Sequence, residues 1–205
     1  MRGLIGKKIG MTRVFDSNGM SVPVTILQAG PCQVTQVKTV EKDGYDSVQV
    51  GFIEAKEKHL TKPLMGHFVK NSVSPKRILA EFNKVPSFDY KTGQVFNVGL
   101  FKEGDYVTVS GKSKGHGFSG TVKKYSFSQQ RKTHGQGDTH RHVGSIGAAS
   151  YPSRVFPGKK MPGRYGNKKV SVKSLKIIKV DKINNQLLLK GSIPGSTNGI
   201  VMVTR

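Results

Sequence analysis

Apolar and polar side chains alternate over several short stretches near the start of the chain, a pattern typical of half-buried β-strands. Residues 12–15 and 21–27 flank the turn-forming residues DSNG and predict a hairpin, in which Pro23 indicates a strand edge or a bulge. Residues 33–40 and 46–53 repeat the pattern around EKDG. We therefore predict a short meander of strands.

Residues 54–93 differ, because their apolar positions follow helical rather than alternating spacing. Ser74 before Pro75 is a suitable pair for a helix N-cap and first turn. One face of this helix would carry Ile78, Leu79 and Phe82. The pattern predicts a small, partly helical insertion between strands.

Strand patterns return at residues 94–98 and 106–109, and again at 174–180, 186–190 and 200–204. Because strands occupy both ends of the chain and a different region separates them, we predict one β-barrel closed by the N- and C-terminal segments. The fold class is therefore mainly β.

The middle of the chain, residues 111–169, is dense in Gly, Lys, Arg and His and shows no regular periodicity beyond about Phe127. Loops longer than about 12–15 residues are uncommon in compact domains and are usually functional or disordered. Ordinary disorder is not favoured, because apolar side chains recur among the charges: Phe118, Phe127, Ile146, Tyr151, Val155, Phe156 and Tyr165. We interpret the region as an extended arm shaped by an RNA surface.

Charge supports this interpretation. The 205 residues include 34 Lys and Arg against 12 Asp and Glu, a net charge of +22. Residues 106–180 hold 16 Lys and Arg against one Asp, or +15, whereas residues 1–105 contribute +5 and the last 25 residues +2. A compact protein with this excess repels itself unless a polyanion neutralises it.

RNA suits the composition of the arm better than duplex DNA does. A backbone that passes between phosphates needs glycine for close approach, cations for charge, and planar groups that stack on exposed bases. The sequence has no helix-turn-helix, no zinc finger, and no basic region joined to heptads. We therefore predict that the protein recognises RNA mainly by the shape of the RNA.

Length and cysteine content exclude other classes. No apolar run approaches the about 18–20 residues that cross a bilayer. The first residues, MRGLIGKKIGMTRVF, lack the continuous apolar segment of a secretory signal. Cys32 is the only cysteine, so neither an internal disulfide nor a zinc site of several thiolates can form. We expect a cytoplasmic protein in which Cys32 is a small core or turn residue rather than a nucleophile.

The stretch GHGFSG at residues 115–120 has the spacing of a dinucleotide-binding turn, and Asp138 lies 18 residues beyond Gly120. That turn needs a helix directly after its third glycine, whereas the continuation TVKKYSFSQQ favours an extended chain. A phosphate-binding loop at residues 111–113 would need glycine where Tyr106 stands. We therefore expect no cofactor.

A second cluster, HGQGDTHRH, contains His134, His140 and His142 and could suggest a metal site or a nuclease. Asp138 is the only carboxylate nearby, and Arg141 separates two of the histidines, so bound divalent metal would be disfavoured. The simpler interpretation is that these histidines hydrogen-bond to RNA or stack on it.

Cations outside the middle region divide into two groups. Three isolated ones, Lys56, Lys91 and Lys182, are most simply solvated surface groups. Four others, Arg2, Lys7, Lys8 and Arg13, fall in one glycine-punctuated segment with no acidic residue before Asp16. They either contact RNA phosphates or belong to the solvated surface.

Six blocks of the sequence, in order and across nearly the whole chain, resemble the universal large-subunit ribosomal protein L3 family in its bacterial form. They are GLIGKKIGMTRVF (3–15), DGYDSVQVGF (43–52), LTKPLMGHF (60–68), GKSKGHGFSGTVKKY (111–125), HGQGDTHRHVGSIG (134–147) and RVFPGKKMPGRYGN (154–167).

The resemblance implies a six-stranded β-barrel of the translation-factor type, an α/β insertion and a long non-globular central extension. On this basis the barrel would comprise residues 1–53, 94–126 and 168–205, the insertion 54–93, and the basic arm 127–167. The arm tip would be about 134–160, with GHGFSG at the arm root.

Members of the family are not catalysts. The resemblance implies a structural rRNA-binding protein that helps nucleate assembly of the large subunit. Its barrel would lie at the outer side of the subunit beside ribosomal proteins L14 and L19, and its arm would reach toward the peptidyl transferase centre. We expect it in the cytoplasm, within the large subunit, with no membrane and no small-molecule substrate.

The candidate rRNA-binding residues are the cations and histidines of the N-terminal segment and the middle region. They are Arg2, Lys7, Lys8, Arg13, Lys112, Lys114, His116, Lys123, Lys124, Arg131, Lys132, His134, His140, Arg141, His142, Arg154, Lys159, Lys160, Arg164, Lys168 and Lys169.

Two positions depart from the family pattern. Ala148 stands where some bacterial members carry a methylated glutamine, so that modification is not expected. Lys124 stands where arginine is frequent, which keeps the charge but loses the planar, bidentate guanidinium.

Two alternative functions remain. An RNA-acting enzyme could use the histidines or GHGFSG, but the basic region contains no paired carboxylates that could act as general base or metal cage. A general nucleic-acid chaperone would share the charge, but it would have no need of a β-barrel that flanks a single long arm.

Overall fold

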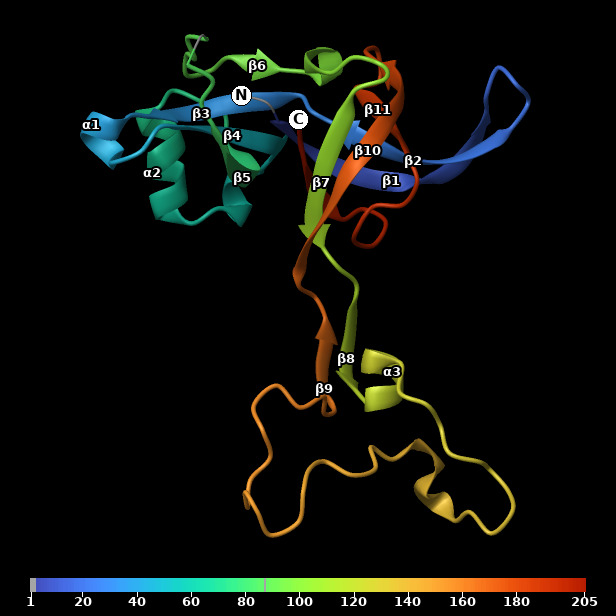
Figure 1. Ribbon diagram of the computed structural model, residues 1–205. Coiled ribbons are helices and arrows are strands. Elements are labelled where there is room, and N and C mark those ends of the chain that lie inside the picture. The colour runs from blue at the N-terminus through green and yellow to red at the C-terminus, as the bar shows by residue number, and fades with distance from the viewer. Residues whose placement is uncertain (1–2, 87) are drawn as a thin grey trace. The chain divides into compact units, whose positions relative to one another are not determined.

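Six antiparallel strands close into a barrel in the order β1-β12-β7-β10-β11-β2 (Figure 1). The computed structural model describes residues 3–86 and 88–205. The barrel strands are β1 (Gly3–Phe15), β2 (Ser21–Ala29), β7 (Tyr106–Lys112), β10 (Lys169–Asp181), β11 (Gln186–Lys190) and β12 (Ile200–Thr204). The predicted six-stranded barrel is thus confirmed, and the ranges expected for its last two strands match β11 and β12.

Alternation of apolar side chains explains why these segments form a barrel. Every second residue points inward, and the inward-facing positions are almost completely buried. The most deeply buried of them are Leu4, Leu27, Val107, Val109, Ile177, Leu187, Leu189, Val201 and Val203. Each such aliphatic side chain contributes about 1.5–3 kcal/mol through removal from water.

Pro23 lies where β2 has a strand neighbour on one side only. The pairing of β2 with β11 runs from Gln28 to Val24, whereas its pairing with β1 continues past Pro23 to Ser21. A proline nitrogen carries no hydrogen to donate, so this position suits it. The predicted strand edge is therefore confirmed.

A second sheet of four strands has the order β5-β4-β3-β6. Its strands are β3 (Cys32–Lys38), β4 (Ser47–Glu54), β5 (Lys76–Asn83) and β6 (Val95–Phe96). The predicted division placed all of residues 1–53 in the barrel, whereas β3 and β4 belong to this second sheet: β3 pairs with β4 and β6 and makes no barrel ladder among the described residues.

The barrel and the second sheet share one apolar core. Gly3 at the start of β1 lies against Phe82 of β5, and a Cβ atom on this glycine would come within 2.6 Å of the Phe82 ring. Burial of Val34, Val50 and Phe82 joins the sheet to the barrel interior. Only glycine leaves room for the aromatic ring at this junction.

Helices are short. In the part of the chain that also holds the two large sheets they are α1 (Val40–Asp43), η1 (Glu57–His59), α2 (Lys62–Lys70) and η2 (Val98–Leu100). Pro63 stands in the first turn of α2, and Phe68 is its buried residue. Among the described residues, no helix has the length and apolar character needed to span a bilayer.

The helix predicted after Ser74 and Pro75 is wrong. These residues precede strand β5, in which Ile78, Ala80 and Phe82 lie opposite Phe52, Val50 and Val48 of β4. The Ser74 hydroxyl donates to Gln33 Oε1 over 3.0 Å instead of capping a helix. Short apolar stretches fit either period, and here the neighbouring strand β4 decides between them.

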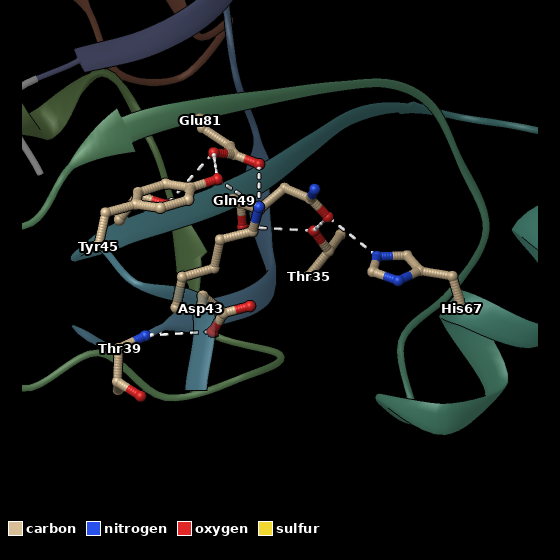
Figure 2. Close-up of polar contacts among 9 residues, drawn as sticks. Thr35, Thr39, Asp43, Tyr45, Gln49, His67 and Glu81 are labelled. Carbon is tan, nitrogen blue, oxygen red and sulfur yellow. Dashed lines mark hydrogen bonds and ion pairs between the residues drawn. The ribbon is translucent and has the colours of Figure 1, made fainter. Parts of the chain in front are cut away.

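Polar side chains on the second sheet form a network around Glu81 (Figure 2). The Lys38 ammonium lies 2.7 Å from Glu81 Oε1 and donates to the Tyr45 hydroxyl over 2.6 Å. That hydroxyl donates to Glu81 Oε2 over 2.9 Å, and Ser47 donates to the same oxygen. The Lys38 ammonium, followed by these hydroxyls, holds the pKa of Glu81 below its usual range.

A second set of contacts attaches α2 to the sheet (Figure 2). His67 Nε2 of α2 lies 2.9 Å from Gln49 Oε1 of β4, and the hydroxyl of the buried Thr35 donates to the same oxygen over 2.8 Å. The helix and two strands are therefore connected through one side-chain amide.

The remaining residues, Lys114–Lys168, form a separate compact unit. We call it the central unit, and we call Met1–Ser113 with Lys169–Arg205 the barrel unit. The central unit contains the two-stranded sheet of β8 (Gly115–Ser119) and β9 (Gly163–Gly166), the helix α3 (Thr121–Tyr125) and the 3-10 turn η3 (Asp138–Arg141). It begins before the predicted arm boundary at residue 127.

Helix α3 corrects the expectation that the chain stays extended after Gly120. Gly120 is its N-cap, Ser126 ends it in the left-handed conformation with φ of 58°, and the Ser126 N–H donates to Val122 O. The turn is formed by hydrogen bonds from the Lys124 and Ser126 N–H groups to Gly120 O and Val122 O, whereas the prediction relied on the β-branched residues of this stretch.

We predict that protonation of Glu81 lowers stability in acid. Because the folded chain depresses the pKa of Glu81, this carboxylate stabilises the fold fully above its unfolded pKa of about 4.3. The stabilisation is lost as the pH falls through the folded pKa. Urea denaturation from neutral pH down to about pH 3 should show a shallower decline for Glu81→Gln than for the wild type.

Glu54→Gln provides the matched control, because the Glu54 side chain is 82% exposed and lies 3.4 Å from Lys76. It should retain the wild-type decline. An unchanged decline in Glu81→Gln would show that Glu81 makes no such contribution.

Candidate nucleic-acid interface

The central unit concentrates positive charge. It contains eleven Lys and Arg residues against the single carboxylate of Asp138, a net charge of +10, and four of the six histidines of the chain. Fifteen of the predicted RNA-binding residues belong to it. Two of them, Lys124 and His140, are half-buried; the exposed ones are Lys114, His116, Lys123, Arg131, Lys132, His134, Arg141, His142, Arg154, Lys159, Lys160, Arg164 and Lys168.

Two lysines of the barrel unit face each other across a strand pair. Lys112 at the end of β7 lies directly opposite Lys169 at the start of β10, and both are exposed. Like charges in this position destabilise a sheet unless an anion lies between or beside them. The structure thus brings these two predicted residues together.

The N-terminal cations separate into different environments. Arg13 is exposed on β1, and its guanidinium lies 5.9 Å from the centroid of the Phe15 ring. Lys7 is half-buried. Arg2 lies outside the described residues. The segment is therefore not the uniform cationic surface that its sequence suggests.

Lys8 requires a correction. It is buried, and its ammonium donates to the carbonyl oxygens of Ile193 and Gly195 over 3.1 and 3.3 Å. The side chain thereby connects β1 to the segment before β12. Its role in the structure is internal hydrogen bonding, and it is not available at the surface as an RNA contact.

GHGFSG forms strand β8 and its end rather than a turn that follows a strand. Gly115 pairs with Gly166 and Gly117 with Tyr165, so that His116 is an extra residue that bulges from the ladder. A dinucleotide turn needs its glycines between the strand and a helix, whereas Gly115 and Gly117 lie within β8. The helix after Gly120 has only five residues.

Aromatic rings accompany the cations. The His116 and Tyr165 rings stack with centroids 4.9 Å apart and planes 18° apart. Lys124 and Lys160 place their ammonium groups 5.0 and 5.8 Å from the Tyr125 ring centroid. This arrangement could not be predicted from spacing, because residues 125 and 160 are far apart in sequence.

Residues 130–142 form a loop closed by its own hydrogen bonds. The Gln130 N–H donates to His140 O, and Gln136 Nε2 donates to Gln130 Oε1 over 2.7 Å. A hollow of about 560 Å³ lies beside it and is lined by Gly120, Thr121, Gln130, Thr139, Arg141 and His142 among others. Arg141 and His142 of this loop thus both line the same hollow.

The histidines of this loop do not form a metal centre in the described part of the chain. No group of three or more His, Cys, Asp or Glu side chains there is arranged to hold an ion. His134 has a positive φ of 62° and is exposed, whereas His140 is half-buried in η3. The histidines of this loop therefore do not share one local environment.

Cys32 lies in the barrel unit and is completely buried. Its thiol donates to Ile5 O over 3.4 Å, and burial raises the pKa of the thiol to about 11. A thiol that stays protonated and has no access to solvent is a poor nucleophile. The sequence-based interpretation of Cys32 as a core residue is confirmed.

Fold and surface together define a class: a β-barrel protein with a second, strongly cationic unit whose exposed rings and glycines suit a folded polyanion. A family model described as Ribosomal protein L3 matches residues 88–187. The chain belongs to the ribosomal protein L3 family in its bacterial form, as its similarity to whole members of the family shows.

That similarity extends over nearly the complete chain. The large ribosomal subunit proteins uL3 of Thermotoga maritima and Thermotoga petrophila are each 49% identical to it over 203 residues, which cover 99% of this chain and 96% of each relative. The corresponding protein of Petrotoga mobilis is 47% identical over 203 residues, with 99% and 94% coverage. The resemblance seen in the six sequence blocks is confirmed.

We predict that Lys8→Ala destabilises the barrel unit. The substitution removes the ammonium that satisfies two carbonyl oxygens, one of them in a buried contact, and should lower the free energy of unfolding by about 1–3 kcal/mol. Chemical denaturation followed by circular dichroism measures this change.

Lys112→Ala is the matched control, because Lys112 is exposed and should change stability by no more than about 0.5 kcal/mol. Equal effects of the two substitutions would contradict the internal role of Lys8.

Proposed function

We propose that this protein is a structural constituent of the large ribosomal subunit that binds large-subunit rRNA through the central unit and helps nucleate assembly of the subunit. The observation that carries the proposal is the charge of that unit, in which eleven cations share one carboxylate. Its relatives are named as large ribosomal subunit proteins, which supports the same placement in the cytoplasmic ribosome.

The proposed mechanism is neutralisation of phosphates by a chain that can approach them closely. Cations such as Arg131, Lys132 and Lys159 would offset the charge of converging RNA segments, whose counterions are then released. Open space beside Gly117, Gly137 and Gly147, where an added Cβ would meet no atom within 4 Å, lets RNA approach the backbone. The predicted RNA-binding residues other than Lys8 remain part of this proposal.

Family resemblance supplies two finer parts of the proposal. The central unit would reach through rRNA toward the peptidyl transferase centre, and the barrel unit would lie beside ribosomal proteins L14 and L19. Exposed apolar side chains on the β1–β2 hairpin support a protein neighbour, because Met11, Phe15 and Met20 are each more than half exposed.

Catalysis is not part of the proposal. Members of the ribosomal protein L3 family are structural proteins, not enzymes. The histidine loop offers one carboxylate, Asp138, whereas a two-metal site for the hydrolysis of RNA uses more than one such group.

We predict that the tagged protein, expressed in a bacterial host, sediments with large ribosomal subunits and remains there after a high-salt wash. Contacts buried within an assembled particle resist salt, whereas peripheral factors held by surface charge alone are released. Sucrose-gradient fractions probed for the tag measure the distribution. Recovery only in the soluble fraction after the wash would contradict a constituent of the subunit.

We also predict that affinity for isolated large-subunit rRNA falls steeply with salt. Each neutralised phosphate should contribute about −0.7 to −0.9 to the slope of log K against log salt concentration. Lys159→Ala should weaken binding and reduce the magnitude of this slope by about 1. Filter binding over a series of potassium concentrations gives both values.

Lys56→Ala is the control for this series, because Lys56 is an exposed cation next to the acidic residues Glu54 and Glu57 of the barrel unit. It should leave affinity and slope unchanged. A slope near zero for the wild type would exclude phosphate neutralisation as the source of affinity.

A further inference from the structure

The β8–β9 ribbon carries rings on both of its faces, and the bulge at His116 is the reason. Directly opposed residues of an antiparallel pair project from the same face, and neighbours along a strand project from opposite faces. Phe118 pairs with Arg164, and Tyr165 is the next residue along β9. Phe118 with Arg164 therefore lies on one face, and Tyr165 lies on the other.

His116 joins Tyr165 rather than Phe118. Two residues apart in a regular strand, His116 and Phe118 would share a face, but His116 is the extra residue of the bulge and its ring stacks on Tyr165 at 4.9 Å. The stretch GHGFSG thus distributes its two planar side chains over the two faces of the ribbon.

Both faces remain open to solvent. The Phe118 side chain is 81% exposed beside the exposed Arg164, and Tyr165 is 37% exposed although it stacks on His116. A phenylalanine with this exposure loses the stabilisation that burial of its ring would bring. Exposed rings that rigid strands present in this way mark a contact surface.

The positive charge around the ribbon indicates which class of ligand the rings bind. The ribbon belongs to a unit of net charge +10, and Arg164 flanks the Phe118 ring within the same face. Nucleobases stack on aromatic side chains and on guanidinium planes, and their phosphates are attracted by the surrounding cations. A base that is paired within a helix has no free face to offer, so the ligand is an unpaired one.

Glycines make the approach possible. Gly117 has a φ of 65°, and an added Cβ there would meet no atom within 4 Å. Gly115, Gly163 and Gly166 are the other glycines of the two strands. With so few side chains, the ribbon is thin enough for bases to reach the rings from both sides.

We propose that the β8–β9 ribbon is a two-faced stacking platform on which Phe118, on one face, and the His116–Tyr165 pair, on the other, each receive one unpaired RNA base. This inference rests on the proposed RNA-binding function and specifies what the ribbon recognises. Affinity from stacking is independent of salt, whereas affinity from phosphates is not, so the two contributions can be separated.

The absence of tryptophan from the chain allows a direct optical test. Phe118→Trp places one fluorophore on the ribbon, and stacking on a base should quench it. Oligouridine is the first probe, the same strand paired with oligoadenylate is the second, and an abasic strand with the same phosphates is the third. Quenching by oligouridine alone is the expected result.

Tyr106→Trp is the matched control, because Tyr106 is 63% exposed on β7 of the barrel unit and lies outside the ribbon. Binding itself is followed separately, by the anisotropy of a fluorescein-labelled oligouridine. Three outcomes would each overturn the proposal: saturated binding without quenching of the residue 118 fluorophore, quenching as strong with the duplex or the abasic strand, or equal quenching at position 106.

Affinities of ring variants test the two faces. Phe118→Ala and Tyr165→Ala should each weaken binding of oligouridine on the order of tenfold without changing the salt slope, and Phe118→Tyr should restore it. Losses that multiply in the double variant support two separate bases, and a double variant no weaker than either single one overturns the two-faced arrangement. Circular dichroism verifies that each variant is folded.

These results separate the inference from the proposed function. If the wild type binds with a steep salt slope and the ring variants bind equally well, phosphate binding is supported and only the stacking platform is contradicted. A protein acting as a platform for an acidic protein segment would show quenching by polyglutamate and none by oligouridine, which also overturns the inference.

Discussion

The antiparallel pairing of β7 with β10 is the interaction on which the architecture depends. It joins a strand from the middle of the chain to one from its final third, with Val109 opposite Val172 and Lys112 opposite Lys169, and it helps close the barrel. The chain leaves this pair after β7 and returns to it at β10, so the whole central unit is inserted between two hydrogen-bonded neighbours. Because the entropy of loop closure grows only slowly with length, the barrel can carry so long an insertion.

The two units differ in how their positive charges are compensated. In the barrel unit, several cations find partners within the protein: Lys38 contacts Glu81, Arg205 contacts Asp105 at 3.1 Å, and Lys8 donates to main-chain oxygens. In the central unit, Asp138 is the only carboxylate available to eleven cations. A stable apolar core therefore supports one part of the chain, while the counter-charge for the other part has to come from a ligand, which we propose to be rRNA.

GHGFSG illustrates how strand geometry changes the meaning of a motif. As a sequence it combines glycine spacing with a histidine and a phenylalanine, which allows a phosphate turn as readily as a strand. In strand β8, its glycines leave few side chains on the ribbon, and its bulge places His116 on the same face as Tyr165. These glycines lie within a strand, unlike those of a dinucleotide turn, and the rings beside them form the surface that we propose for unpaired bases.

Much of this could be predicted from the sequence, because some signals are local. Alternating apolar residues indicate strands such as β4 and β7, and the single carboxylate between residues 106 and 180 determines the charge of the region without any structure. Family membership followed from ordered blocks of sequence. None of these inferences needs knowledge of which residues meet in space.

Other features were decided only by the tertiary structure. The stretch after Pro75 is a strand because β4 offers it a partner, although its apolar spacing also fits a helix. Lys8 is buried because the segment around Ile193 and Gly195 covers it, although its sequence neighbours resemble a cationic surface. In each case the deciding contact comes from residues distant in sequence, and pairing or burial energies of several kcal/mol exceed local preferences of less than about 1 kcal/mol.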